Sequence, residues 1–244
     1  QPAAGDAGGS LGAALAYWHL ELNQKREKKS KDSMQGSYLG PSFTNAEIKK
    51  TLDEIGADYN ELDDMKIIDQ TSEDLAKGKA VGWFQGRMEF GPRALGNRSI
   101  IVQAKDVSVN DWLNKKLRRT EFMPFAPITL KNDKDKYYKD IKKKEPCMKF
   151  MTITVDCKKK ALTNFPAAVH IDKTARPQLI DKKYNSFLYD LILNYKKITR
   201  SGTLINTSFN MHEEPIVCSP KDALRAFKLG NLDYLFIGNY ILKS

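Results

Sequence analysis

Residues 203–217 read "TLINTSFNMHEEPIV", an apolar run that ends in small polar side chains. The apolar part predicts a strand, because aliphatic and β-branched residues favour strands. Four small polar residues follow at its end: Asn206, Thr207, Ser208 and Asn210. Their hydroxyls and amides can orient a ligand without adding charge, and strand ends are where open α/β sheets bind ligands. The same side chains could instead form a turn that satisfies its own backbone.

Outward from this strand, strand-like and helix-like segments alternate along the chain. The expected strands cover residues 80–85, 99–104, 125–130, 150–156, 175–180, 202–208 and 233–238. The expected helices cover residues 72–79, 108–119, 185–199 and 219–230, the second with Ser108 and the last with Ser219 as its cap. This alternation predicts the α/β or α+β class, with a twisted mixed sheet and flanking helices.

The first 43 residues differ in composition from the rest. Residues 5–30 predict a Gly-rich turn that feeds a helix with a charged end, and residues 32–44 are rich in Gly, Ser and Pro. Thr44 or Asn45 can then cap a helix that Gly56 ends. We therefore expect a tail or linker over 1–43 and one domain over 44–244.

The bulk composition indicates a globular protein. Of the 244 residues, 41% are hydrophobic and 29% are charged. No apolar run approaches the roughly 20 residues that cross a bilayer, and no signal-peptide pattern opens the chain, so we expect a cytoplasmic location and no membrane partner. Three cysteines, odd in number and without metal-site spacing, predict reduced thiols: Cys147, Cys157 and Cys218.

The net charge of +10 suits either an anionic partner or a well-solvated surface. Lysine clusters occur at residues 24–31, 131–144 and 157–160. They mix with acidic residues and lack regularly interleaved aromatic residues, which favours exposed faces over nucleic-acid contacts.

A second motif, "GRMEFGPRALGNRS" over residues 86–99, places Arg87, Arg93 and Arg98 among glycines. Guanidinium groups stay charged and grip phosphate or carboxylate with paired hydrogen bonds, and glycines allow close backbone approach. The motif predicts a clamp for a phosphate or acyl phosphate. The alternative is a surface turn whose arginines pair with Glu89 and other acidic residues.

Two further segments carry charge. "NKKLRRTEFMPFAP" (114–127) crowds basic residues at a helix end, where the helix dipole alone favours them. "HIDKTARPQLI" (170–180) holds His170, Asp172 and Arg176, but no serine or cysteine nucleophile is indicated nearby, so a hydrolase triad is disfavoured. A P-loop kinase is also disfavoured, since no GxxxxGK[ST] occurs.

Taken together, these segments resemble the carbamoyltransferase family that includes nodulation and antibiotic-tailoring O-carbamoyltransferases. The match runs in order through "PAAGDAGGSLGAAL", "YLGPSFTNAEI", "GRMEFGPRALGNRSI", "RTEFMPFAP", "HIDKTARPQLI", "NTSFNMHEEPIV", "DALRAF" and "DYLFIGNYIL". The resemblance implies two domains: an N-terminal ATPase-like domain of the actin, sugar-kinase and Hsp70 superfamily, and a C-terminal YrdC-like domain. This chain would hold the second domain and only the tail of the first.

The resemblance also implies an activity. The YrdC-like domain would form carbamoyl-adenylate and pyrophosphate from carbamoyl phosphate and ATP, with Mg²⁺ on the phosphates. The N-terminal domain would pass the carbamoyl group to a hydroxyl-bearing small molecule, and it would contain a metal ion such as iron. Since most of that domain lies outside this chain, we expect the fragment to lack full transfer activity, and the acceptor cannot be read from it.

Site residues carry over by position. Arg93 matches the arginine of "FGPRALG", Arg176 that of the "HxDxxxR" pattern, and Ser208 and Asn210 the "SxN" element. Asp6 matches an aspartate that helps to hold a metal and nucleotide, but its partner histidines would lie upstream, because the histidines here lack HxxxH spacing.

Before "PFAP" the family commonly has a lysine and two arginines. Arg119 takes one arginine position, whereas Leu117 and Met123 fall on the other two, with Lys116 and Arg118 as neighbouring cations.

Positioning and charge compensation would lower the barrier for attack on the ATP α-phosphate. The expected catalytic residues are Arg93, Arg176, Lys116 and Arg119. The expected substrate- and nucleotide-binding residues are Arg87, Arg98, Arg118, Asn206, Thr207, Ser208 and Asn210.

Two other interpretations stay open. YrdC-like domains also occur in tRNA-modifying systems, and a charge of +10 would suit an RNA-binding module. A salt-dependent RNA shift would favour that interpretation, whereas pyrophosphate release that requires carbamoyl phosphate would favour the enzyme. The fragment could also fold and be inert without its acceptor half. The sequence specifies no oligomeric state.

Overall fold

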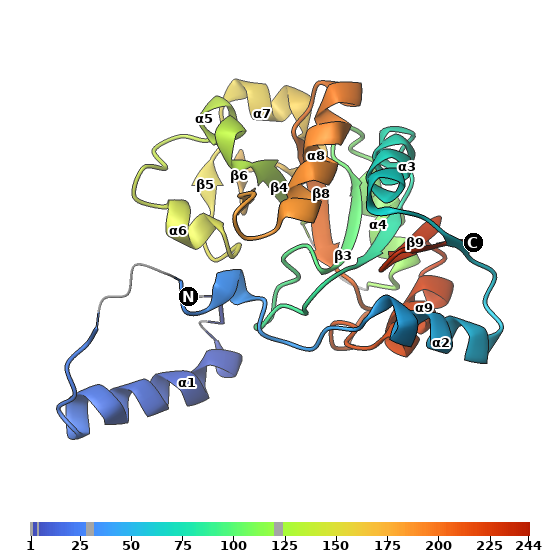
Figure 1. The fold of residues 1–244 in the computed structure, drawn as a ribbon. Coiled ribbons are helices and arrows are strands. Elements are labelled where there is room, and N and C mark those ends of the chain that lie inside the picture. Colours follow the sequence, from blue (N-terminus) through green and yellow to red (C-terminus); the bar gives the residue numbers. More distant parts are fainter. Residues whose placement is uncertain (1, 4, 28–31, 120–123) are drawn as a thin grey trace.

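The computed structural model describes residues 2–3, 5–27, 32–119 and 124–244, with the side chain of Asp6 excepted (Figure 1). In this part of the chain, an eight-stranded mixed sheet runs in the order β1-β10-β9-β2-β3-β8-β4-β7. Its strands are β1 Asn60–Glu61, β2 Val81–Phe84, β3 Arg98–Gln103, β4 Ala126–Leu130, β7 Gln178–Ile180, β8 Thr203–Ser208, β9 Tyr234–Ile237 and β10 Tyr240–Lys243. A separate antiparallel pair consists of β5 Val155–Asp156 and β6 Thr174–Ala175.

Helices cover both faces of the sheet. The described α-helices are α1 Asp6–Ala16, α2 Asn45–Ile55, α3 Asp64–Ala76, α4 Val109–Lys116, α5 Lys134–Tyr137, α6 Glu145–Met148, α7 Lys159–Asn164, α8 Ser186–Thr199 and α9 Pro220–Leu229. Shorter segments are the π-helix Tyr17–Glu21 and the 3₁₀ turns Gln35–Ser37, Lys131–Asp133 and Pro166–Ala168. In Figure 1, α1 lies apart from the sheet, while α3 and α8 lie side by side against it.

The alternation of side chains along the central strands explains this arrangement. Trp83 and Ile101 pack with the apolar faces of α3 and α8 in one buried cluster. Phe84 and Ile100, the neighbours of these residues in sequence, pack in a second cluster with the apolar residues of α2, α4 and α9. Successive side chains of a strand point to opposite faces, so the apolar strands require a helical layer on each side. The α/β class with flanking helices is confirmed.

Several predicted helix ends are also confirmed. Thr44 caps α2 in a capping box with Glu47, and Gly56 ends it in the left-handed conformation. Ser219 caps α9 in a capping box with Asp222. These signals depend only on the residues around each helix end, so they can be recognised without knowledge of the fold.

Three expectations are wrong in detail, and one strand was missed. The helix expected over 72–79 begins eight residues earlier, at Asp64. Only the last two residues of the strand expected over 150–156 pair with another strand, because Met151 adopts a left-handed φ of 53° inside a turn. Ser108 precedes α4 but makes no side-chain cap. The strand β10, which lies between β1 and β9, was not expected from the sequence.

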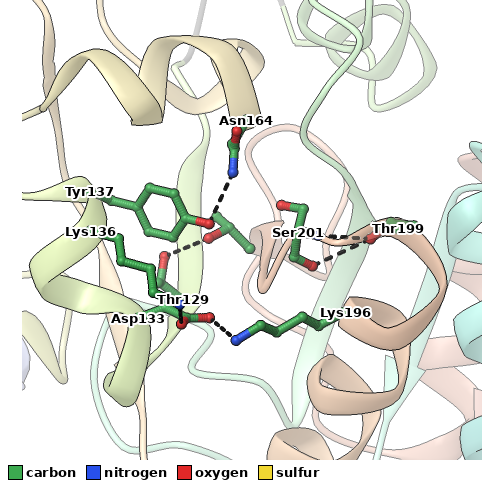
Figure 2. Close-up of polar contacts among 9 residues, drawn as sticks. Thr129, Asp133, Lys136, Tyr137, Asn164, Lys196, Thr199 and Ser201 are labelled. Atoms are coloured by element: carbon green, nitrogen blue, oxygen red, sulfur yellow. Dashed lines mark hydrogen bonds and ion pairs between the residues drawn. The ribbon is translucent and has the colours of Figure 1, made fainter.

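The end of β4 remote from the "NTSFN" segment carries a charged cluster (Figure 2). The Asp133 side chain is 2% exposed and lies between two ammonium groups. Lys136 Nζ lies 2.6 Å from one carboxylate oxygen, and Lys196 Nζ lies 2.6 Å from the other. The buried Thr129 hydroxyl is hydrogen-bonded to other hydroxyl groups close by. This end of the sheet is therefore held by paired charges and by hydrogen bonds between buried hydroxyl groups.

Candidate functional site: a cationic pocket at the strand ends

A cavity of about 220 Å³ opens where β8 ends and β4 begins. It is lined by parts of the chain that are far apart in sequence. Its lining residues are Pro92, Arg93, Ala94, Arg119, Pro124, Phe125, Ala126, Met151, Arg176, Asn206, Thr207, Ser208, Asn210, Met211, His212 and Glu213. The structure therefore brings the two motifs into one cavity, together with two arginines from other segments.

Three guanidinium groups face this cavity from three segments. Arg93 comes from the 86–98 loop, Arg119 from the segment after α4, and Arg176 from the connection between β6 and β7. Within the part of the chain that the structure describes, none of them forms an ion pair with a carboxylate. The pocket thus gathers positive charge that no described carboxylate neutralises.

The pKa values of these three guanidinium groups reflect their burial. Burial and, to a smaller extent, the like charge of Arg93 lower the pKa of Arg176 to about 10. Burial also lowers the pKa values of Arg93 and Arg119. All three still carry a charge near neutral pH. Keeping them charged and partly desolvated costs free energy, which an anionic ligand would offset.

Arg119 is fixed in place by two contacts. Its Nη2 donates a hydrogen bond of 3.1 Å to Thr207 Oγ1, and its guanidinium lies 5.5 Å from the centre of the Phe125 ring. The contact with Thr207 joins the segment after α4 to the end of β8. It leaves other guanidinium donors of Arg119 on the lining of the cavity.

The side chains of Ser208 and Asn210 are held by their own hydrogen bonds. Ser208 Oγ donates to Asn210 Oδ1 at 2.8 Å, and Asn210 Nδ2 donates to the Glu214 carbonyl at 2.6 Å. The Glu214 carboxylate pairs in turn with Arg225 of α9. The expected alternative of a self-satisfied turn is therefore partly realised, yet both residues line the cavity and each retains further hydrogen-bonding capacity.

The 86–98 loop is folded around the buried side chain of Glu89. One of its carboxylate oxygens accepts backbone N–H groups of Leu95 at 2.7 Å, Asn97 at 2.6 Å and Arg98 at 3.2 Å. Burial raises the pKa of Glu89, although these hydrogen bonds favour its ionised form. Gly96 has a φ of 103°, and a Cβ there would overlap the Leu188 side chain. Glu89 therefore organises the loop and forms no ion pair with a described arginine.

Two arginines of this motif lie outside the pocket lining. Arg98 is fully buried, donates to the carbonyls of Gln85 at 2.8 Å and Asn97 at 2.9 Å, and stacks 3.6 Å from the centre of the Phe84 ring. Arg87 donates to the Leu39 carbonyl at 3.0 Å. Arg98 therefore holds the loop together from within, and Arg87 ties it to the N-terminal segment.

Two cations of the 114–119 region also lie elsewhere. Lys116 donates to the Asn231 carbonyl, and Arg118 is exposed with a left-handed φ of 56° just past α4. Of the expected basic cluster, Arg119 alone among described residues lines the pocket. Met123, the other position in question, lies outside the described residues.

The pocket-lining residues that were not expected from the sequence include Met151, Met211, His212 and Glu213. His212 and Glu213 directly follow the "SFN" element, so their place in the chain could have indicated them. Glu213 has a left-handed φ of 61° and brings a carboxylate to the rim of the cavity. Met151 reaches the pocket only because its segment turns, and no local signal marks it.

His170 and Asp172 belong to a small turn. His170 Nδ1 lies 3.0 Å from Thr174 Oγ1, and that hydroxyl donates to Asp172 at 2.7 Å. Neither residue is among those that line the cavity. Burial lowers the pKa of His170; the charge of Asp172 opposes this shift, and the weaker effect of Arg176 adds to it. These contacts support a structural role for the pair.

Metal binding finds no support in the described residues. No group of three or more His, Cys, Asp or Glu side chains among them is arranged to hold a metal ion. The side chain of Asp6, the expected metal residue, lies outside the described part. The three cysteines form no disulfide. No helix in the described ranges is long and apolar enough to span a membrane.

The mixed sheet defines an α/β domain of YrdC-like fold, with a cationic pocket at its strand ends. The solved structure of full-length HypF in its phosphate- and nucleotide-bound form shares this fold, with a TM-score of 0.51 and 20% sequence identity. The similarity covers 71% of this chain and 25% of that one.

The chain belongs to the carbamoyltransferase family. Residues 72–244 match the family model described as the carbamoyltransferase C-terminus. Nodulation protein NolO of Bradyrhizobium diazoefficiens is 35% identical over 250 residues, which cover 100% of this chain and 44% of that protein. The 3'-hydroxymethylcephem-O-carbamoyltransferase of Streptomyces clavuligerus is 29% identical over 68% of this chain and 30% of its own length.

This chain spans less than half the length of these relatives. Nodulation protein NolNO of Sinorhizobium fredii is 35% identical over 250 residues. The match covers 100% of this chain and 35% of that protein. The family membership is shown for this portion alone. The activity, substrates and partners of the whole protein are matters for proposal.

Proposed function

We propose that this carbamoyltransferase domain activates a carbamoyl group: it forms carbamoyl-adenylate from carbamoyl phosphate and ATP. The observation that supports this most directly is the convergence of Arg93, Arg119 and Arg176 on one cavity without a described carboxylate partner. Both reactants are polyanions, so a site that holds them together needs cations that no protein group has already neutralised.

The chemistry can be written as two balanced steps. Water cleaves the O–P bond of carbamoyl phosphate, which gives carbamate and inorganic phosphate. A carbamate oxygen then attacks the α-phosphorus of ATP, the bond to the β-phosphate oxygen breaks, and pyrophosphate leaves. The second step needs no general base, because the carbamate oxygen is already ionised.

The proposed site residues have two roles: charge compensation and orientation of the carbamoyl group. Arg93, Arg119 and Arg176 would offset the charge that develops on the phosphates, while the Ser208 and Asn210 side chains would orient the carbamoyl group. Such donors act strongly because the protein fixes them in advance in a partly desolvated site.

Mg²⁺ would accompany ATP and supply further charge compensation on its phosphates. Glu213 is the carboxylate that the described lining offers, so the nucleotide itself would provide most of the oxygen ligands. Transfer of the carbamoyl group to a hydroxyl-bearing small molecule would take place in the part of the protein that lies beyond this chain. The domain boundary near residue 44 and the tail over 1–43 belong to the same proposal.

The test is ATP–pyrophosphate exchange that depends on carbamoyl phosphate. We expect the substitutions Arg93→Ala and Asn210→Ala each to lower the exchange rate by at least about 100-fold, since one lost transition-state donor commonly costs that much. Circular dichroism should show that both variants stay folded. The exposed Arg26 serves as the control, because Arg26→Ala removes a guanidinium remote from the pocket lining and should leave the rate unchanged. Full exchange in both pocket variants would refute the site.

A further inference from the structure

The peptide that follows Arg93 is held by buried side chains from three separate elements. The Leu95 carbonyl accepts hydrogen bonds from Gln178 Nε2 at 2.7 Å and from the Tyr38 hydroxyl at 2.9 Å. The Ala94 carbonyl accepts one from Asn206 Nδ2 at 3.2 Å. Two successive carbonyls of the loop are therefore fixed to β7, to β8 and to the segment before α2.

The two amides that make these contacts are also bonded to each other. Asn206 Nδ2 donates to Gln178 Oε1 at 2.7 Å, and each residue is only 2% exposed. The two backbone carbonyls set the orientation of both amides, because each carbonyl requires an N–H group opposite it. In this arrangement both amide nitrogens donate to the loop, and Asn206 Oδ1 is left without a hydrogen-bond partner among the described residues.

Arg93 depends on this support for its place. Its guanidinium forms no ion pair within the described residues, so nothing at the tip of the side chain holds it before a ligand binds. Its position follows from its backbone, which is clamped directly afterwards by the amide pair and, through the Leu95 N–H, by Glu89. A site group whose backbone is fixed loses less freedom when it binds an anion.

We propose that Gln178 is a positioning residue for Arg93, and that Asn206 acts with it instead of contacting the ligand. The Gln178–Asn206 pair joins the "NTSFN" strand to the arginine loop and so sets the geometry of the anion pocket. The inference rests on the anion binding of the proposed function but not on its chemistry.

The test is a double-mutant cycle on the affinity for inorganic pyrophosphate, measured by titration calorimetry. Gln178→Met keeps the volume of the side chain but removes both of its hydrogen bonds. We expect it to weaken pyrophosphate binding about tenfold in the presence of Arg93, because residues coupled this way show interaction energies of the corresponding size. In an Arg93→Met background the same change should leave the remaining affinity unaltered.

Two further variants separate positioning from stability. Thr129→Val removes a buried hydroxyl at the far end of the sheet, which is hydrogen-bonded to Tyr138 and Thr203. It should lower the melting temperature as Gln178→Met does, while leaving pyrophosphate affinity unchanged. If Gln178→Met fails to fold, Tyr38→Phe removes a single donor to the Leu95 carbonyl and should weaken binding about threefold.

The outcomes are distinct. Equal affinity of Gln178→Met and wild type, or a tenfold loss that persists without Arg93, overturns the positioning role and leaves the proposed function intact. A cycle that behaves as expected in a protein that catalyses no exchange refutes the proposed function and supports the positioning role. Wild-type protein that binds no pyrophosphate overturns both.

Discussion

The strand pair β4 and β8 has cations near both of its ends, but the two ends hold them differently. At the far end, Lys136 and Lys196 each lie 2.6 Å from a carboxylate oxygen of the buried Asp133 (Figure 2). At the near end, arginines surround a cavity of about 220 Å³ and form no ion pair with a described carboxylate.

The difference distinguishes cations that are paired within the protein from cations that are available to a ligand. A partly buried cation with a carboxylate partner has its desolvation cost offset within the protein. A partly buried cation without one lowers stability, so a cluster of such groups indicates a site where an external anion supplies the missing charge. We therefore assign the paired end to stability and the unpaired end to the proposed binding of an anion.

The largest expected effect is at the unpaired end. Arg176→Met should lower pyrophosphate affinity by at least about 100-fold, since a desolvated charge partner is lost. The same substitution should raise the free energy of unfolding. Burial holds the pKa of Arg176 below its unfolded value, so at neutral pH the charged group costs folding free energy that methionine does not.

Calorimetry and urea unfolding of the same preparation check this prediction. A lower free energy of unfolding for Arg176→Met would contradict the contrast between the two ends, because the cation would then stabilise the fold. Met is a suitable replacement because its length keeps the packing of the arginine stem.

Much of the sheet could be predicted from the sequence, because its strands are short apolar runs bounded by turn and cap signals. The segment from 150 to 156 could not. It is as apolar as a strand, but Met151 adopts a left-handed conformation that depends on tertiary packing. The strand β10 also gave no signal, since it is only four residues long.

The site was predictable to the extent that its residues lie in recognisable motifs. Arg93, Arg176 and Arg119 belong to such motifs, and the structure brings them together. Sequence could not tell which way neighbouring arginines point, so Arg98 was expected to bind substrate beside Arg93, although it is fully buried among backbone carbonyls. Gln178 carried no signal, since a single glutamine in a strand acquires meaning only from its partners.

The next effect in size concerns the paired end. Asp133→Asn should lower the free energy of unfolding by about 2 kcal/mol, as two charge-assisted hydrogen bonds weaken. Pyrophosphate affinity should stay at the wild-type value, because the cluster lies at the other end of β4 and β8. Urea unfolding at neutral pH gives the first quantity and calorimetry the second. A loss of affinity would mean that the two ends are coupled.

The pH dependence of stability sharpens the same contrast. Burial alone would raise the pKa of Asp133, but hydrogen bonds from Lys136 and Lys196 hold it below its usual value. A carboxyl with a depressed folded pKa stabilises the protein above its unfolded pKa of about 3.9 and loses that contribution as the pH falls through the folded pKa. Urea unfolding at pH 7, 5 and 3 should therefore show a smaller acid loss in Asp133→Asn than in wild type. Identical slopes would exclude this carboxyl as a source of acid sensitivity.

The smallest effect separates the two lysines that share Asp133. The Lys136 side chain is 49% exposed and that of Lys196 is 32% exposed, so water screens the first pair more. Lys136→Met should cost about 0.5 kcal/mol, the usual value for an exposed pair, and Lys196→Met should cost more. Raising the salt concentration to 1 M should lower the cost of Lys136→Met further, because exposed pairs are screened by salt. Equal costs for the two lysines would show that the carboxylate, and not the exposure of its partners, sets the strength of the paired end.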